Sequence, residues 1–169
     1  MINNKLTQIN QEQLVEINVP VKPYIKRYLI KRYGMVHKIS KRSLIGFMML
    51  DLLDKNITTH DKDQTKTENY TFLIGDYYFK KYGFSMSEDN INYLSGCFDR
   101  LFNEDFLNFI DTELLKGSLN AYQSVSLFLS IYKIPEAELK HDSMYRKYQR
   151  YSEENIKKKK QNNNKIIAN

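Results

Sequence analysis

The 169-residue sequence predicts a mainly α-helical protein with a small two-stranded β element and a C-terminal three-helix unit resembling a helix-turn-helix. Three observations predict this fold class. Between residues 88 and 116, apolar side chains recur at intervals of mostly three or four, as on the buried face of a helix. Residues 14–21 alternate between apolar and other side chains, as a strand does. Residues 120–155 form three short helical patterns with tight connections.

The N-terminal third contains one expected strand and two expected helices. The alternation "LVEINVPV" predicts a strand over residues 14–19, which Pro20 and Pro23 end. Pro23 also suits the first turn of the helix "PYIKRYLIKRYG", with Gly34 as its C-terminal stop. The next helix, "SLIGFMMLDLLDKN", is apolar nearly all round, so we expect it in the core with Ser43 as its N-cap.

The middle of the chain adds a second strand and two helices. Residues 54–68 have no apolar period and predict a flexible loop. "NYTFLIGD" then predicts a strand that pairs with the first one. A short helix, "DYYFKKYGFSMS", ends at Gly83, and Ser87 caps the long helix that follows, which residues 103–105 bend or divide.

The C-terminal region predicts a tri-helical unit over about residues 118–155. Its first helix starts at Ser118 or Asn120, and Pro135 occupies the first turn of a short middle helix. Asp142 or Ser143 caps the last helix. We therefore expect a single helical domain over residues 1–155 and a basic, Asn- and Lys-rich tail over residues 156–169.

Charge is distributed in a basic, acidic, basic order. Residues 1–49 hold nine Lys and Arg against two acids, residues 50–118 hold seven against thirteen, and residues 119–169 hold ten against five. Two basic segments can converge on one face and bind a polyanion. They can equally pair with the acidic middle, whose acids at positions 104, 105, 111 and 113 are most simply explained as a solvated helix face.

The last helix has the arrangement that a DNA-recognition helix needs. At 100° per residue, one arc contains Met144, Tyr148 and Tyr151, and the opposite side contains Arg146, Lys147 and Arg150. One face would then pack while the other presents cations to base edges and phosphates. The run that follows would add phosphate contacts independent of sequence, through Lys157, Lys158, Lys159 and Lys160. Two alternatives stay open, a solvated helix end and a protein-contact surface.

A second basic cluster lies in the first helix. We expect Lys26, Arg27 and Lys31 to support DNA binding as phosphate contacts. The alternative is a solvated helix that keeps the protein soluble.

No residue set predicts an enzyme, a metal site or a cofactor. The three histidines, His37, His60 and His141, are far apart and have no metal-ligand spacing with the single Cys97. No glycine-rich phosphate loop follows a strand, and no nucleophile stands in a recognised motif.

Location is predicted from two further features. The longest apolar run, "LIGFMMLDLL", is too short to cross a membrane, so we expect no membrane partner. The N-terminal stretch has no apolar segment of a secretory signal, and one cysteine fits a reducing compartment. These features favour the cytoplasm, which the resemblance described next would make that of a bacterial host.

Three stretches carry a resemblance. At "VPVKPYIKRYLIKRYG", "FKKYGFSMS" and "AYQSVSLFLSIYKIPEAELKHDSMYRKYQRY", about half of the chain resembles small uncharacterised proteins encoded by phages and other mobile elements of gut bacteria. In these, a V-P-V-K-P-Y type segment precedes a C-terminal helical unit ending in a K-x-Y-x-R pattern. Here Lys147-Tyr148-Gln149-Arg150 carries that pattern in shifted form. The resemblance implies a phage or mobile-element context, in which a DNA-binding role is expected, and supplies no active site.

The sequence therefore predicts a non-enzymatic DNA-binding protein of a phage or mobile element, such as a transcriptional regulator. The alternative is a virion structural or interaction protein, such as a neck, connector or packaged protein. Its basic and acidic surfaces would meet those of neighbouring subunits or of other phage proteins.

Overall fold

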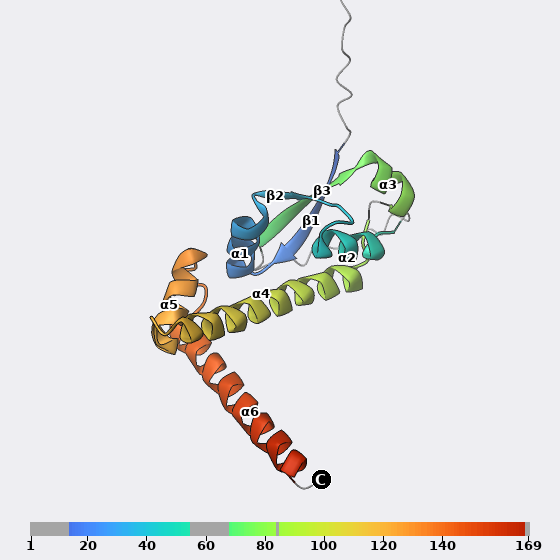
Figure 1. Cartoon of the computed structure of the whole chain (residues 1–169). Coiled ribbons are helices and arrows are strands. Elements are labelled where there is room, and N and C mark those ends of the chain that lie inside the picture. The colour runs from blue at the N-terminus through green and yellow to red at the C-terminus, as the bar shows by residue number, and fades with distance from the viewer. Residues whose placement is uncertain (1–13, 55–67, 84, 168–169) are drawn as a thin grey trace, which may run out of the picture. The chain divides into compact units, whose positions relative to one another are not determined.

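The computed structural model describes residues 14–54, 68–83 and 85–167, with side chains up to residue 158. It is mainly helical with one small sheet, as the sequence predicts (Figure 1). The elements in chain order are β1 (Leu14–Val21), α1 (Pro23–Tyr33), β2 (Val36–Lys38), α2 (Leu44–Leu52), β3 (Glu68–Gly75), α3 (Asp76–Tyr82), α4 (Glu88–Lys116), α5 (Ala121–Ile131) and α6 (His141–Ile167).

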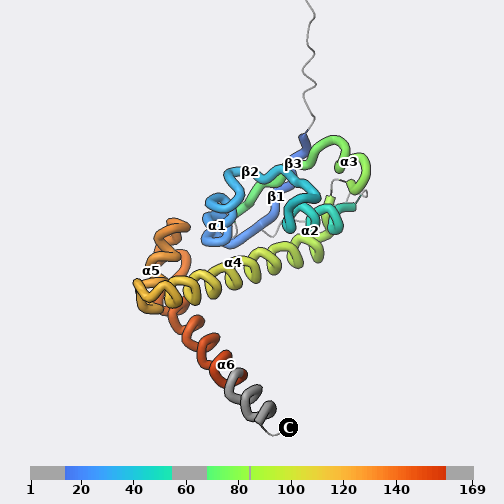
Figure 2. Tube along the Cα trace, in the orientation of Figure 1, coloured from blue at the N-terminus to red at the C-terminus, as the bar shows by residue number. Residues whose placement is uncertain are grey.

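The chain divides into two compact units. The first comprises Met1–Val21 and Tyr33–Ser95, and so contains the sheet, α2, α3 and the start of α4. The second comprises Lys22–Arg32 and Gly96–Asn169, and so contains nearly all of α1, the rest of α4, α5 and α6. Figure 2 lets the reader follow the chain from one unit to the other and back. Since α4 belongs to both units, this division does not test the single domain expected over residues 1–155, which stays a prediction.

The sheet of the first unit has the strand order β1-β3-β2. β1 and β3 are antiparallel from Leu14 opposite Gly75 to Val21 opposite Glu68, which confirms the predicted pairing of two strands. β2 is parallel to β3 and was not predicted, because three residues are too few to show an alternating pattern.

The first strand is longer than predicted. Pro20 was expected to end it, yet β1 continues to Val21 and Pro20 lies opposite Asn69. A proline lacks the N–H that a central strand needs, but an edge strand tolerates it. β1 is such an edge strand, and the buried Val19 and Val21 keep its last residues on the core.

Most buried side chains described in the first unit come from the sheet and α2. β3 contributes Tyr70, Phe72 and Ile74, and α2 contributes Ile45, Met49 and Leu50, all buried. α2 begins as predicted, because the Ser43 hydroxyl accepts a hydrogen bond from the Gly46 N–H at 3.0 Å.

Most predicted helix ends are confirmed. Gly34 and Gly83, which follow α1 and α3, have φ of +93° and +110°, a region that glycine enters without a steric cost. The Ser87 hydroxyl accepts from the Asn90 N–H at 3.2 Å. Asn120 forms a capping box with Gln123 at the start of α5. Residues 103–105 do not divide α4, which is helical throughout.

The predicted middle helix of the C-terminal unit is wrong. Pro135 O accepts from the N–H groups of Glu138 and Leu139, which makes turns instead of a helix. The cap of α6 is also wrong, because the helix starts at His141, before Ser143. The Glu136 carboxylate accepts from the His141 N–H at 3.0 Å and satisfies one of the donors that a cap would otherwise bind.

Two further predictions concern the C-terminal tail and the loop over residues 54–68. The tail expected from residue 156 is helical up to residue 167, because α6 continues that far. Glu153 and Glu154 stand four residues before Lys157 and Lys158, an order of charges that favours helix. The loop expected over residues 54–68 lies, for residues 55–67, outside the described residues.

Two helical glycines give a matched test of this packing. A Cβ at position 46 would meet the backbone oxygen of Ser40, and would lie 2.7 Å from the Ser40 nitrogen. Gly46→Ala is therefore expected to lower the free energy of unfolding by about 1–3 kcal/mol. At Gly96 an added Cβ has no described atom within 4 Å, so Gly96→Ala is expected to raise it by about 1 kcal/mol. Urea unfolding of both variants measures the two changes, and an equal or reversed pair of effects would contradict the packing of α2.

Candidate nucleic-acid interface

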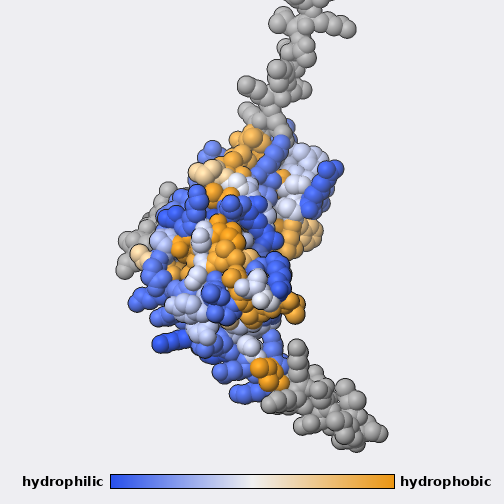
Figure 3. Space-filling model, turned by 60° about the vertical axis from the view of Figure 1, so that its left-hand side comes forward, coloured by the Kyte–Doolittle hydropathy of each residue, from blue (hydrophilic) through white to orange (hydrophobic). Residues whose placement is uncertain are grey.

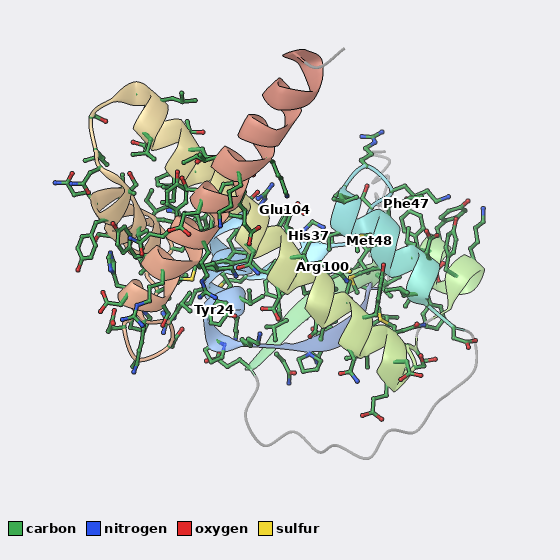
Figure 4. The ribbon with its side chains drawn as sticks, turned by 90° about the horizontal axis from the view of Figure 1, so that it is seen from below. Tyr24, His37, Phe47, Met48, Arg100 and Glu104 are labelled. Atoms are coloured by element: carbon green, nitrogen blue, oxygen red, sulfur yellow. The ribbon has the colours of Figure 1, made fainter. Side chains whose placement is uncertain are left out.

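Two aspartates of α4 hold α1 in the second unit. The Tyr28 hydroxyl donates to the Asp105 carboxylate and accepts from Arg32, which also forms an ion pair with Asp105. One turn and a half before, Asp99 accepts from Lys22 at 2.7 Å and from the Tyr24 hydroxyl at 3.2 Å. The hydrogen bond to Asp99 raises the pKa of Lys22. The buried Tyr28 and the half-buried Tyr24, labelled in Figure 4, thus pack against Phe102 while their hydroxyls reach carboxylates.

A third acid binds the predicted phosphate contact Arg27. Its Nε is 2.9 Å from both oxygens of Glu138, and its Nη2 is 2.7 Å from Oε1. This geometry ties α1 to the turn that precedes α6. Of the other two predicted contacts, Lys26 is half-buried and Lys31 is exposed. Of the four basic residues of α1, Arg27 and Arg32 therefore follow the second of the two alternatives and pair with acids of the chain.

The packed face of α6 is as predicted. Met144 and Tyr148 are buried, and the Tyr148 hydroxyl donates to Asp111 at 2.7 Å. The Tyr151 hydroxyl donates to the other oxygen of Asp111 at 3.2 Å. Burial, with the Asp111 hydrogen bond and charge, raises the pKa of Tyr148 well above its ordinary value, so it stays a hydrogen-bond donor. α6 is thereby fixed against α4 in its rotation about its own axis.

The opposite face of α6 presents cations. Arg146 and Arg150 are exposed one helical turn apart, and Lys157 and Lys158 are exposed further along. Figure 3 shows α6 as mostly hydrophilic up to the grey atoms. The backbone of Lys159 and Lys160 continues the helix, but their side chains lie outside the described residues.

Lys147 differs from its two neighbours. Its Nζ donates to Asn103 Oδ1 on α4, its side chain is half-buried, and burial lowers its pKa. Position 147 lies three residues after Met144 and four before Tyr151, so it borders the packed face. The prediction that it points outward with Arg146 and Arg150 is therefore wrong.

The acids of α4 were also misjudged. Of the four expected on a solvated face, Asp105 and Asp111 bind the residues described above, and Glu113 is 8% exposed and paired with Lys116 at 2.6 Å. Glu104 is exposed as expected (Figure 4). The charge order along the chain was the sequence signal that pointed to such pairing.

One histidine arrangement outwardly resembles a hydrolase triad. His141 Nε2 is 3.0 Å from Ser126 Oγ, and its Nδ1 is 3.7 Å from Asp142. Nε2 also lies 3.1 Å from the Tyr122 carbonyl oxygen, which can only accept. A proton on Nε2 is then needed for that bond, so this nitrogen is not available as a base for Ser126. The arrangement fits a histidine that ties α6 to α5.

The second unit also has one open groove of about 270 Å³ beside α4 and α5. Asp105 and Glu113 are its acidic lining residues, and Phe109, Phe128 and Tyr132 supply its aromatic wall. Both carboxylates already hold cations, Arg32 and Lys116, so the groove has little uncompensated charge.

Metal-site and membrane criteria are not met within the described ranges. Over residues 14–54, 68–83 and 85–167, no three His, Cys, Asp or Glu residues are grouped to hold a metal ion. Over the same ranges, every helix is too short or too polar to cross a bilayer.

Comparison with known proteins gives no relative. No protein-family model, no curated protein and no solved structure matches the chain. The resemblance to phage and mobile-element proteins is not tested by this and stays a prediction. Function is therefore inferred from the chain's own residues.

The Asp111 anchor can be tested by stability. Asp111→Ala leaves the buried Tyr148 hydroxyl without its acceptor, and is expected to lower the free energy of unfolding by about 1–3 kcal/mol. Glu104→Ala removes an exposed acid from the same helix and is expected to change it by less than about 0.5 kcal/mol. Urea unfolding measures both, and two equal effects would contradict the anchoring role.

Proposed function

We propose that the protein is a non-enzymatic DNA-binding protein that reads duplex DNA with α6. One observation carries the proposal. The two faces of α6 are separated, since Tyr148 and Tyr151 bind Asp111 while Arg146 and Arg150 are exposed on the other side. A helix that enters a groove must be held firmly on one face and present donors on the other.

In this proposal, α5 and α6 act as a helix-turn-helix-like unit. The turn at Pro135–Leu139 replaces the middle helix, and Glu138 on that turn is held by Arg27. Arg146 and Arg150 contact base edges, where a guanidinium can bind guanine through two hydrogen bonds. Phosphate contacts come from Lys157, Lys158, Lys159 and Lys160 and depend on charge alone.

The contribution of α1 is smaller in this proposal than the sequence suggests. Arg27 would have to exchange Glu138 for a phosphate, and Lys26 is half-buried. Lys31 is the exposed member of the three, and supports binding as a phosphate contact. The proposed biological context is transcriptional regulation in a phage or mobile element, for which the resemblance supplies the support.

A second candidate is a virion structural or interaction protein. Leu115 near the end of α4 is 89% exposed, and Tyr122, Leu127 and Ile131 on α5 are exposed as well. Exposed apolar side chains of this size favour a protein contact. Light scattering separates the two candidates, since a ring-sized oligomer supports the virion protein and a monomer or dimer supports the regulator.

The recognition role has a direct binding test. Arg146→Ala with Arg150→Ala is expected to weaken binding to a duplex selected from a random library by about tenfold or more, because each two-bond contact to guanine contributes about 1–3 kcal/mol. Binding to unselected duplex is expected to weaken less. Fluorescence anisotropy on both duplexes measures the ratio.

The control removes the same charge elsewhere. Arg42→Ala with Arg100→Ala takes away two exposed arginines outside α6 and is expected to keep the preference for the selected duplex. An equal loss on selected and unselected DNA in the α6 variant would refute the recognition role.

A further inference from the structure

The first unit has a surface cluster of tyrosines and lysines on and beside α3, in which Tyr77, Lys41 and Lys81 are exposed and Tyr78 and Tyr82 are half-buried. Tyr77 is 65% exposed, and its ring is 5.3 Å from that of Tyr78, which is 6.1 Å from that of Tyr82. Lys81 lies 5.8 Å from the centre of the Tyr77 ring and 5.5 Å from that of Tyr82. Lys41, just before α2, lies 5.2 Å from the centre of the Tyr82 ring. We name these five residues the Tyr–Lys surface.

Packing explains only part of the Tyr–Lys surface. No residue of α3 is buried, although four of its seven residues are aromatic. A seven-residue helix is far below the length that is stable alone, and the exposed Tyr77 ring adds no buried area that would support it. Cation–π contacts of the Tyr77 and Tyr82 rings with Lys41 and Lys81 are favourable in this arrangement.

Charge on the Tyr–Lys surface is mainly positive, although the carboxylate of Asp51 on α2 also acts on the Tyr82 hydroxyl. Asp76 and Lys80 pair with each other at 2.6 Å and cancel. Lys41 and Lys81 remain beside the rings, and the hydrogen bond with Lys41 lowers the pKa of the Tyr82 hydroxyl. Aromatic faces interleaved with ammonium groups suit a ligand that has both planar rings and anionic groups.

We propose that the Tyr–Lys surface binds single-stranded nucleic acid, with a base stacked on Tyr77 and neighbouring phosphates on Lys41 and Lys81. Exposed bases offer ring faces to a protein, and base–aromatic stacking is tolerant of sequence. A duplex keeps its base faces within the stack, where Tyr77 cannot reach them. An acidic peptide would use the lysines but leave the rings uncovered. The proposal is independent of α6, because every residue in it belongs to the first unit.

The chain contains no tryptophan, which permits a specific probe. Tyr77→Trp keeps a stacking ring and makes it the only indole in the protein. Titration of the full-length variant with a short oligothymidylate is expected to quench its fluorescence, and a duplex of equal length is expected to quench it much less. Binding of the oligonucleotide by anisotropy without any quenching would overturn the proposal, as would the absence of binding.

Paired substitutions test the affinity. Tyr77→Ala with Tyr82→Ala is expected to weaken oligothymidylate binding by about five- to a hundredfold, the range for loss of base stacking. Tyr77→Phe keeps the ring and is expected to bind as the unaltered protein does. Tyr93→Ala removes another exposed tyrosine of the same unit and is expected to have no effect. Unchanged binding in the double variant would overturn the proposal.

Testing each variant with the other surface's ligand distinguishes α6 from the Tyr–Lys surface. Arg146→Ala with Arg150→Ala is expected to leave oligothymidylate binding intact, and Tyr77→Ala is expected to leave duplex binding intact. Loss of oligothymidylate binding in the α6 variant, with normal binding in the Tyr77 variant, would assign single strands to α6 and refute the Tyr–Lys surface. Failure of duplex binding alone would refute only the role of α6.

Discussion

The acceptors on α4 are the constraint on which the second unit depends. Asp99 and Asp105 bind α1, and Asp111 binds α6. Asp105 and Asp111 accept hydrogen bonds from the hydroxyls of Tyr28 and Tyr148. Both tyrosines are buried, so their hydroxyls need a partner within the protein. A carboxylate at each of these positions therefore does more than attract a cation. It permits a large aromatic ring to enter the core with its polar end satisfied, and it fixes the rotation of the helix that carries the ring.

These acids also decide which basic residues are left to contact a partner. The N-terminal basic segment loses Lys22, Arg27 and Arg32 to acids of the unit. The C-terminal basic segment keeps Arg146 and Arg150 exposed, because Lys147, Tyr148 and Tyr151 make its contacts to α4. The two basic segments thus differ in structure, since the first supplies ion pairs within the unit and the second leaves two arginines of α6 exposed. Counting charges along the sequence does not separate them, since both segments mix tyrosine with lysine and arginine.

Burial distinguishes structural tyrosines from surface tyrosines better than the neighbouring residues in the sequence do. Tyr28 is 0% exposed and bonded to a carboxylate, which is the environment of a structural residue. Tyr77 is exposed and accompanied by ammonium groups, which is an environment suited to a base and its phosphates. Both stretches, "PYIKRYLIKRY" and "DYYFKKY", combine tyrosines with lysines. Burial is therefore the property that assigns their roles.

Local signals predicted most of the fold, and long-range contacts account for the rest. Ser43, Ser87 and Asn120 predicted helix starts because capping is decided within three residues. β2 was missed because three residues form a strand only through their partner β3. The turn at Pro135 is satisfied by contacts that arrive from α1 and α6, which no local pattern contains.

The candidate site was likewise predicted where it depends on local periodicity and missed where it depends on long-range contacts. Helical periodicity placed Arg146 and Arg150 opposite Tyr148 correctly, because both faces belong to one helix. It misplaced Lys147 because Asn103, its partner, lies 44 positions away on α4. The bond from Arg27 to Glu138 spans 111 positions and was equally invisible. The tertiary structure therefore determines which basic side chains are bound by other residues of the protein.

The reactivity of individual lysines toward acetylation, with and without duplex DNA, tests this separation most directly. In the protein alone, Lys22 is predicted to react slowly, because it is bonded to Asp99, and Lys157 and Lys158 are predicted to react rapidly. Duplex DNA is predicted to protect Lys157 and Lys158 and to leave Lys22 unchanged, as read by mass spectrometry of the digested protein. Protection of Lys22 and Lys31 with no change at Lys157 and Lys158 would contradict the account, because it would place the nucleic acid on α1 and leave α6 without a role.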